Sequence, residues 1–355
     1  MTLTYAEFAA AVDAWPHAQQ HDASELTLPD ALICLFAAAQ QGVPVHVEDP
    51  AARPHRSEIP GDAFLLVATS GSTGMPRPLA RTARSWADSF DEFTSVTRIS
   101  PSDRVLVTGP LHATMHLFAA VHALWLGACV TDAAASATVT HAVPAVLRTL
   151  VGTVPNLHTA VVGGTGLDAA AAELAGNIGL VEYYGAAELS LVAIRRVPAP
   201  LRLLDGVEAE IRDGLLFVRS PYRVLGVGEW VGVGDLAALG PGGELVVRGR
   251  GEAAIDVGGT TVVAEDVERV LESIDGVRAA AVIGTPHAVL GETVTGVIEL
   301  EAGTLLGATK TSARALLQKE AVPRRWAVVE KLPRTGSGKI ARAQVKHSMM
   351  TDSTL

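Results

Sequence analysis

The chain has 355 residues, of which 48% are hydrophobic and 19% charged, and its formal net charge at pH 7 is −10. This length predicts one large domain or two domains, with ample apolar material for a core. The acidic balance argues against general binding to nucleic acid or to an anionic membrane surface, because both need clustered Lys and Arg. Two cysteines, Cys34 and Cys129, in apolar surroundings exclude a disulfide framework and a paired-cysteine metal site.

Neither a secretory leader nor a membrane span is expected. The N-terminal stretch MTLTYAEFAAAVDAW lacks a basic region followed by an apolar core. The most apolar long stretch, 111–130, is interrupted by His112, His116 and His122, and it predicts a buried helix in which His116 and His122 have core roles. Buried thiols fit a reducing compartment. We therefore expect a cytoplasmic protein without integral membrane association.

Apolar runs alternate with helical patterns over the first 200 residues. The expected elements are, in chain order, helices at 5–15 and 30–41, strands at 43–47 and 64–68, a helix at 82–97, a strand at 103–108, a helix at 113–126, a strand at 129–131, and an apolar run, turn and helix over 159–175. Strands that alternate with helices predict doubly wound, mostly parallel α/β sheets.

The pattern changes at about residue 200 and again at about residue 250. Short β-like runs punctuated by glycines predict a small antiparallel β subdomain over 200–249. The remaining residues predict a strand and amphipathic helix over 260–274, strands at 277–284 and 294–301, and a helix at 309–321. We expect an α/β N-terminal domain, 1–249, and a small, mobile α+β C-terminal domain, 250–355.

A loop rich in Ser, Thr and Gly follows the strand at 64–68. The stretch 68–80 reads ATSGSTGMPRPLA, so backbone NH groups and hydroxyls precede the cation Arg77. Such a loop forms a concave anion site, and its glycines let the backbone close on phosphates. The spacing G-x-x-x-x-G-K-[ST] of the Walker loop is absent. Taken alone, the loop is explained equally well as a solvated turn.

Three further segments carry groups that suit a nucleotide site. EYYGAAELS, 182–190, offers an aromatic face at Tyr184 and, at Glu188, an oxygen ligand of the kind that Mg²⁺ shares with phosphates. VGVGDLAAL has Asp235 after a glycine, where it could accept hydrogen bonds from a ribose. LPRTGSGKIAR carries Lys339, which could reach a carboxylate or phosphate. Each segment alone also has an ordinary structural explanation, such as a turn aspartate or a solvated basic tail.

The order and spacing of these segments resemble the adenylate-forming superfamily of acyl-CoA synthetases, peptide-synthetase adenylation domains and luciferases. TSGSTGMPR resembles the phosphate loop of that superfamily, VVGGTGL the turn that borders the adenine, and YYGAAE its Tyr-Gly-x-Thr-Glu motif. GVGDL resembles the ribose-binding segment, GRGEAAIDVGG the hinge, and PRTGSGKI the segment with the adenylation lysine. The resemblance covers roughly residues 30–345.

The resemblance implies a role for each matching residue. Lys339 would bridge the attacking carboxylate and the α-phosphate, Glu188 would hold Mg²⁺, and His112 would line the acyl pocket. The nucleotide would be bound by Thr69, Ser70, Gly71, Ser72, Thr73, Gly74 and Arg77 at the phosphates, by Gly163, Gly164, Thr165, Tyr184, Gly185 and Ala186 at the adenine, and by Asp235 and Arg250 at the ribose.

The sequence departs from the family pattern at several of these motifs. The substitutions are Arg77 for Lys in the phosphate loop, Ala187 for Thr before Glu188, Val233 for Thr before the ribose-binding Asp, and Glu252, Ala253 and Asp256 at the hinge. Only about 68 residues precede the phosphate loop, so the N-terminal subdomain is expected to be shortened.

The implied activity is that of an AMP-forming acid–thiol ligase. Such an enzyme uses ATP and Mg²⁺ to convert a carboxylic acid to an acyl-adenylate and pyrophosphate, and then transfers the acyl group to coenzyme A. The segment GPLHATMHLFAAVHALWLG has no carboxylate to hold an α-ammonium group, so a fatty or small organic acid is favoured over an α-amino acid. No carrier-protein domain is expected after residue 345, which favours free coenzyme A as the acceptor.

Two alternatives stay open. The first is an o-succinylbenzoate–CoA ligase of menaquinone synthesis, which would need a cation for its second carboxylate; Arg81 and Arg84 are candidates, although we expect both to face solvent or phosphate. The second is a nucleotide-binding homologue without catalysis, which the retention of Glu188 and Lys339 disfavours. The oligomeric state is left open, a homodimer included.

Overall fold

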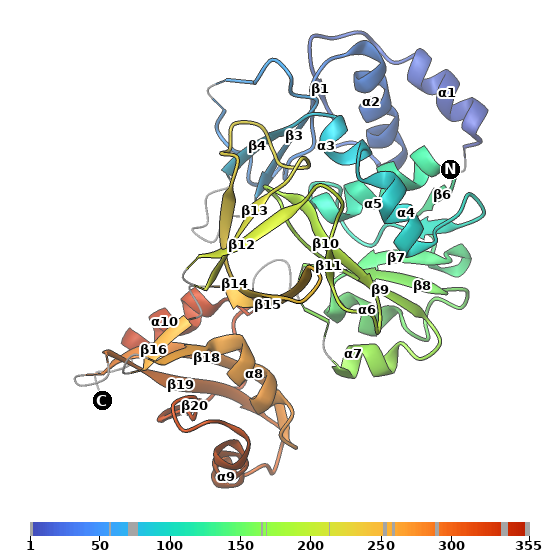
Figure 1. Cartoon of the computed structure of the whole chain (residues 1–355). Coiled ribbons are helices and arrows are strands. Elements are labelled where there is room, and N and C mark those ends of the chain that lie inside the picture. The colour runs from blue at the N-terminus through green and yellow to red at the C-terminus, as the bar shows by residue number, and fades with distance from the viewer. Residues whose placement is uncertain are drawn as a thin grey trace. The chain divides into compact units, whose positions relative to one another are not determined.

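The computed structural model describes residues 3–56, 58–69, 77–164, 166–167, 169–212, 214–250, 254–257, 260–287, 291–334 and 340–351 (Figure 1). The chain divides into two compact units. The large unit comprises Met1–Glu210, Phe217–Val233 and Leu239–Leu245, and the small unit comprises Ile211–Leu216, Gly234–Ala238 and Val246–Leu355. Within the described ranges, no helix combines the length and the hydropathy needed to cross a membrane.

The first sheet carries the start of the predicted phosphate loop. Its strands lie in the order β1 (His21–Asp22), β2 (Val45–His46), β3 (Leu65–Thr69) and β4 (Arg77–Arg81), next to the helices α1 (Tyr5–Asp13) and α2 (Leu28–Gln41). The first three strands run parallel, and β4 returns antiparallel to β3 with Thr69 opposite Arg77. Thr69 and Arg77, which flank residues 70–76, therefore lie side by side.

The second sheet forms most of the large unit. In spatial order its strands are β6 (Cys129–Thr131), β5 (Arg104–Leu106), β7 (Val139–Ala142), β8 (Thr159–Val162), β9 (Gly179–Ala186), β10 (Ser190–Arg196), β11 (Arg202–Leu203), β15 (Glu244–Arg250), β14 (Val231–Gly240), β13 (Leu215–Arg219) and β12 (Glu208–Arg212). The pairs from β6 to β9 are parallel, and β9–β10, β10–β11 and β11–β15 are antiparallel.

Helices surround the parallel part of this sheet. They are α3 (Arg84–Ala87), α4 (Phe90–Thr97), α5 (Thr114–Leu126), α6 (Pro144–Leu150) and α7 (Ala169–Leu174), with the 3₁₀ turn Ala134–Ser136. Every residue of β7 and β8 is buried. Strands buried on both faces are typical of a parallel sheet covered by helices on both sides, as the sequence predicts.

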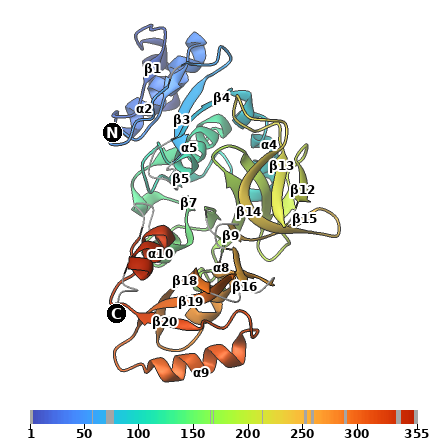
Figure 2. The same cartoon turned by 90° about the vertical axis from the view of Figure 1, so that its left-hand side faces the viewer.

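The small unit ends in an α+β arrangement. Its strands are β16 (Ala254–Val257), β17 (Thr260–Val263), β18 (Val277–His287), β19 (Gly291–Leu300) and β20 (Arg325–Val328), and its helices are α8 (Ala264–Glu272), α9 (Leu306–Leu316) and α10 (Arg342–Thr351). β18 and β19 are antiparallel, and β20 lies parallel to β19 (Figure 2).

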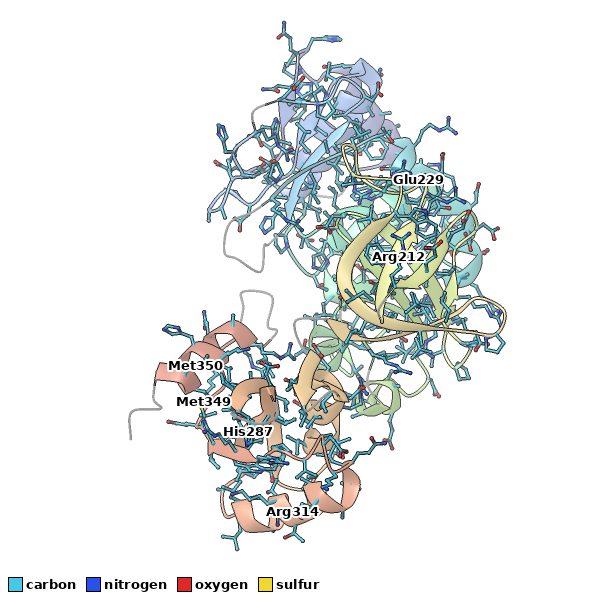
Figure 3. All side chains as sticks on the ribbon, turned by 60° about the vertical axis from the view of Figure 1, so that its left-hand side comes forward. Arg212, Glu229, His287, Arg314, Met349 and Met350 are labelled. Atoms are coloured by element: carbon cyan, nitrogen blue, oxygen red, sulfur yellow. The ribbon has the colours of Figure 1, made fainter. Side chains whose placement is uncertain are left out.

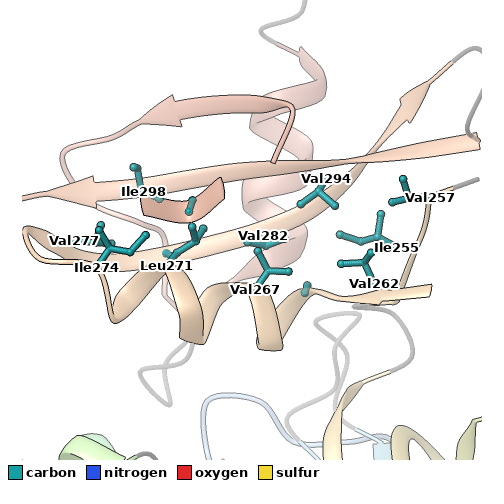
Figure 4. Packing of buried hydrophobic residues seen from close by; sticks show 13 residues of the cluster. Ile255, Val257, Val262, Val267, Leu271, Ile274, Val277, Val282, Val294 and Ile298 are labelled. Atoms are coloured by element: carbon teal, nitrogen blue, oxygen red, sulfur yellow. The ribbon is translucent and has the colours of Figure 1, made fainter. Parts of the chain in front are cut away.

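Alternate residues of β18 supply two separate cores of the small unit. Ala280 and Val282 pack with Val267 and Leu271 of α8 on one face (Figure 4). Ala279, Ala281 and Ile283 pack on the other face with Val345 of α10. This is the two-residue period of a strand that is covered on both sides. Figure 3 labels Arg314 on α9 and Met350 on α10, which lie on either side of these strands.

Two expected helices have different bounds in the structure. The pattern at 82–97 forms α3 and α4, separated at Asp88–Ser89, where the Ser89 hydroxyl donates to the Trp86 carbonyl at 2.7 Å. Serine bonding of this kind competes with helix continuation. The helix expected at 309–321 runs from Leu306 to Leu316. The residue after it, Leu317, already has an extended backbone, with φ −103° and ψ 149°.

Candidate active site

Glu188 lies at the tip of the β9–β10 hairpin. Ser190 pairs with Ala186, and the Leu189 NH donates to the Ala186 carbonyl at 3.0 Å. The Glu188 carbonyl accepts a hydrogen bond of 2.8 Å from the Val224 NH. A Cβ at Gly185 would come within 2.2 Å of the Ser190 carbonyl oxygen, so only glycine fits this tight turn. The turn thus fixes the backbone of Glu188, whose side chain is 15% exposed.

Arg77 and Glu188 form an ion pair, although 111 residues separate them in the sequence. Arg77 begins β4, at the end of the predicted phosphate loop, and its Nη2 donates to Glu188 Oε1. The structure therefore brings together the predicted phosphate-binding cation and the predicted metal ligand. Thr69 ends β3, but Ser70, Gly71, Ser72, Thr73 and Gly74 lie outside the described residues.

The glycine turn after β8 contacts an aromatic ring that sequence reasoning missed. A Cβ at Gly163 would lie 2.4 Å from Cε1 and Cζ of Tyr183, and Gly164 has φ +81°. Burial raises the pKa of the Tyr183 phenol. Tyr184, the predicted adenine-stacking residue, is the next residue of β9, and successive side chains of a strand point to opposite faces. Thr165 lies outside the described residues.

Glu182 connects the glycine turn to the hairpin. Its Oε1 accepts a hydrogen bond of 2.8 Å from the Leu167 NH, and its Oε2 accepts one of 2.7 Å from Arg195 Nε on β10. The carboxylate is 12% exposed. The parallel register of β8 and β9, with Val162 opposite Glu182, brings Glu182 beside the glycine turn. The sequence motif alone does not specify this strand pairing.

His112 lies in the turn before α5, and its Nε2 is 4.0 Å from Asp49 Oδ2. His116, His122 and His141 are buried, as expected for the first two. Burial lowers the pKa of His122 to about 4, so its ring is neutral at pH 7. Aromatic rings of Phe90, Phe93 and Phe118 surround His122.

The expectation that Arg81 faces solvent or phosphate is wrong. Arg81 is 2% exposed, because its guanidinium reaches into the interior of the large unit and donates to the Tyr222 and Ala187 carbonyls. Arg84 is exposed, as expected, and its Nε is 3.3 Å from Asp88 Oδ2 one helical turn later. Arg81 therefore does not stand free to bind a second substrate carboxylate, whereas Arg84 makes only an exposed surface ion pair.

The remaining predicted site residues belong to the small unit. Asp235 lies on β14 and is buried, and Arg250 ends β15, with its side chain outside the described part. Gly249, beside the predicted hinge, has φ +122°, and a Cβ there would lie 2.4 Å from Glu265 Oε2. Lys339 is outside the described residues, which resume at Ile340, opposite Arg334.

Arg342, three residues after the predicted adenylation lysine Lys339, binds two glutamates of α8. Its Nη2 lies 2.7 Å and 2.9 Å from the two carboxylate oxygens of Glu268, and its Nη1 lies 3.0 Å from Glu265 Oε1. The Val282 NH also donates to Glu268 at 2.7 Å. These bonds join the start of α10 to α8 and β18, three residues beyond Lys339.

The carboxylate near the predicted phosphate loop suits Mg²⁺ bound together with a nucleotide better than a metal ion held by protein ligands alone. Among the described residues, no group of three or more His, Cys, Asp and Glu side chains could hold an ion. Mg²⁺ commonly binds through one or two carboxylates and takes further oxygens from substrate phosphates and water. Glu188, a carboxylate beside a predicted phosphate-binding loop, fits that requirement.

Comparison with known proteins identifies the family. The family described as "AMP-binding enzyme" matches residues 2–254, and the "AMP-binding enzyme C-terminal domain" matches residues 266–339. An uncharacterized acyl–CoA ligase, YhfT, of Bacillus subtilis (strain 168) is 31% identical over 347 residues, 84% of this chain and 71% of the relative. A probable 2-succinylbenzoate–CoA ligase of Mycobacterium tuberculosis is 36% identical over 190 residues, 50% of this chain and 49% of the relative.

The fold is shared with solved structures. ATP-bound MatB from Rhodopseudomonas palustris superposes with a TM-score of 0.82 at 19% identity, covering 97% of this chain and 93% of MatB. This likeness confirms the predicted fold class, a mixed α/β large domain with a small C-terminal domain. The chain belongs to the AMP-binding enzyme family, within the adenylate-forming superfamily that its motifs resemble.

Proposed function

We propose that the protein is an AMP-forming acid–CoA ligase. Family membership and the similarity to an acyl–CoA ligase over 84% of the chain support this activity. The observation that carries the proposal is the pairing of Arg77 with Glu188 at the end of the hydroxyl-rich loop. Arg77, a cation suited to the polyphosphate, therefore lies beside Glu188, a carboxylate suited to its metal ion.

The chemistry requires activation of a carboxylate, whose direct leaving group would be oxide. Attack of a carboxylate oxygen on the α-phosphorus of ATP forms an acyl-adenylate and releases pyrophosphate. Attack of the coenzyme A thiol on the acyl carbon then forms the thioester and releases AMP and a proton. The chain's contribution is to orient these groups and stabilise the developing charge.

Each predicted residue has a task in this scheme. The loop 69–77 binds the β- and γ-phosphates, and Glu188 holds Mg²⁺, which when bound neutralises phosphate charge. Tyr184 stacks on the adenine beside the turn 163–165. The ribose is held by Asp235 and Arg250, and Lys339 approaches the attacking carboxylate and the α-phosphate from the C-terminal domain, 250–355.

The ion pair is compatible with the proposed binding roles of both residues. Arg77 and Glu188 contact each other in the structure. A bound polyphosphate would contact Arg77 instead, and Glu188 would hold its metal. Because Arg77 is 69% exposed, the ion pair that is broken stabilises the chain only weakly.

A fatty or small organic acid is the favoured substrate class. The helix α5 and the turn before it carry no carboxylate for an α-ammonium group. The 36% identity to a 2-succinylbenzoate–CoA ligase over 190 residues favours that enzyme as a second candidate. Of the two candidate cations for its second carboxylate, Arg81 is buried and Arg84 is exposed with only a weak surface ion pair to Asp88, so we rank this enzyme second.

The test is acid-dependent pyrophosphate release from ATP, measured with a panel of fatty, aromatic and dicarboxylic acids. Acids that give release are then incubated with ATP and coenzyme A, and the thioester is identified by mass. Release with one acid class followed by its CoA thioester is the expected result. ATP binding without release for any acid would instead indicate a nucleotide-binding protein without catalysis.

A further inference from the structure

Arg81 is the largest fully buried side chain among the described residues. It lies four residues after Arg77 on β4, so the two arginines share one face of the strand. Arg77 contacts the Glu188 side chain, and Arg81 contacts the backbone just before Glu188. Both cations of β4 therefore act on the tip of the β9–β10 hairpin.

The contacts of Arg81 hold Glu188 from two directions. Its Nη2 donates to the carbonyl of Ala187, the residue before Glu188. Its Nη1 donates at 2.7 Å to the Tyr222 carbonyl, and two residues later the Val224 NH donates at 2.8 Å to the Glu188 carbonyl. The guanidinium thus connects the hairpin tip to the segment 222–224 that supports it.

The positive charge of Arg81 has no ion-pair partner among the described residues. Its polar partners are the two carbonyls and the Ser85 hydroxyl at 3.5 Å, while its Nε has none. The Trp86 ring centroid lies 5.8 Å from its Cζ. Burial lowers the pKa of Arg81 to about 10, an effect that the charge of Glu188 opposes. Burying an unpaired cation is costly, so packing alone does not account for an arginine here.

We propose that Arg81 is a positioning residue for Glu188, which fixes the carboxylate where it holds the metal of the bound nucleotide. This inference rests on the proposed role of Glu188 in binding Mg²⁺ with ATP. Residues that orient a metal ligand typically change metal affinity by 10–100-fold when they are replaced. Arg81 acts through the backbone and through its charge, and it touches neither metal nor substrate.

The test measures metal-dependent binding without turnover. An ATP analogue with a methylene bridge between the α- and β-phosphates is titrated by calorimetry at increasing Mg²⁺, which gives the half-saturating Mg²⁺ concentration. Arg81→Met removes the charge and the hydrogen bonds at similar length, whereas Arg81→Lys keeps the charge but lacks the planar fork that reaches both carbonyls. Arg84→Met, an exposed arginine three residues away, is the matched control, and Glu188→Gln tests the metal ligand itself.

We expect Arg81→Met to raise the half-saturating Mg²⁺ concentration by about 10–100-fold. Arg81→Lys should give a smaller rise, and Arg84→Met should give none. If Arg81→Met does not fold, Arg81→Lys decides the question. A lower melting temperature with an unchanged Mg²⁺ requirement in the folded Arg81 variants would mean a purely structural role and would overturn the inference.

The Glu188→Gln variant separates this inference from the proposed function. If Glu188→Gln changes the Mg²⁺ requirement and the Arg81 variants do not, the inference fails while the proposed metal ligand stands. If Glu188→Gln has no effect, or the unaltered protein does not bind the analogue with Mg²⁺, the proposed site and the inference fail together.

Discussion

At the scale of single residues, Arg77 combines a weak structural role with a strong proposed binding role. An exposed ion pair contributes about 0–1 kcal/mol to stability, whereas a charge-assisted hydrogen bond to a phosphate contributes about 1.5–3 kcal/mol to binding. Arg77→Gln is therefore expected to weaken ATP binding by about 10–100-fold in calorimetry, with little change in the melting temperature.

Arg53→Gln is the control, because Arg53 is also an exposed arginine of the large unit, 2.6 Å from Asp22. It should leave ATP affinity unchanged. An Arg77→Gln protein that binds ATP as tightly as the unaltered protein would remove Arg77 from the phosphate site.

His122 gives a second prediction at this scale. Burial lowers the pKa of His122 to about 4, below the ordinary value of 6.5, so the folded chain binds fewer protons than the unfolded chain between these pH values. The contribution of His122 to stability therefore falls as the pH drops from 6.5 toward 4, by about 2 kcal/mol between pH 7 and pH 5.

Urea unfolding at pH 7 and pH 5 measures this loss for the unaltered protein and for His122→Gln. In the unaltered protein, His122 Nε2 lies 2.8 Å from the Thr94 hydroxyl, a hydrogen bond that the glutamine amide can still make. The variant should lose about 2 kcal/mol less between the two pH values. His17→Gln, a substitution at an exposed position, should lose as much stability between the two pH values as the unaltered protein. Equal losses in His122→Gln and the unaltered protein would show that His122 is not held neutral by burial.

The sequence identifies these residues better than it identifies their partners. Arg77 and Glu188 were each assigned from motifs, yet their pairing needs the return of β4 and the β9–β10 turn, which bring residues 111 apart together. Arg81 was misjudged because an isolated arginine normally faces solvent. Its burial depends on β4, a strand that the sequence pattern does not predict. Tyr183 was missed because its contact with Gly163 depends on strand register.

At the scale of elements, the β9–β10 hairpin determines where Glu188 stands. A Cβ at Gly185 would meet the Ser190 carbonyl oxygen at 2.2 Å, so Gly185→Ala must open the turn. Overpacking of this kind costs about 1–3 kcal/mol, and the displaced tip should also bind ATP and Mg²⁺ more weakly. Urea unfolding and calorimetry measure the two effects.

Gly61→Ala is the matched control, since nothing lies within 4 Å of its added Cβ and the position is exposed. It should change the free energy of unfolding by less than about 0.5 kcal/mol. A Gly185→Ala protein with unaltered stability and ATP affinity would mean that the turn adapts without moving Glu188.

Element types followed from the sequence more reliably than element ends. The alternation of apolar runs and helices predicted the parallel strands β5, β6 and β8, because buried strands and covering helices both leave strong patterns, but it did not predict β7 or β9. The strand β4 was not predicted, since its Arg-Pro-Leu-Ala-Arg sequence has no strand period. The start of α4 depends on a local serine effect, and the end of α9 on the extended backbone at Leu317, neither of which a helical period reports.

At the scale of the whole chain, the proposed chemistry uses residues from both compact units. Glu188 belongs to the large unit, and Lys339 to the small unit, beside the anchor that Arg342 makes with Glu268. A lysine that acts only on the α-phosphate step should matter for adenylation and not for thioester formation. Its placement stays a prediction.

Lys339→Ala is expected to slow acyl-adenylate formation by about 10²–10³-fold, the effect of losing one transition-state donor. Thioester formation from supplied acyl-adenylate and coenzyme A should change much less. Quenched time courses of the two half-reactions measure both rates. Lys331→Ala serves as the control, because Lys331 is an exposed lysine of the same unit. Equal loss in both half-reactions would remove Lys339 from the adenylation step.

The reaction with an acid labelled with ¹⁸O in its carboxylate tests the central claim most directly. Attack of the carboxylate on the α-phosphorus, followed by transfer of the acyl group to coenzyme A with cleavage of the acyl C–O bond, must leave one ¹⁸O atom in AMP and none in pyrophosphate. Mass spectrometry of the products should show that distribution. Label in inorganic phosphate with ADP as the product, or AMP without label, would contradict an acyl-adenylate route for this protein.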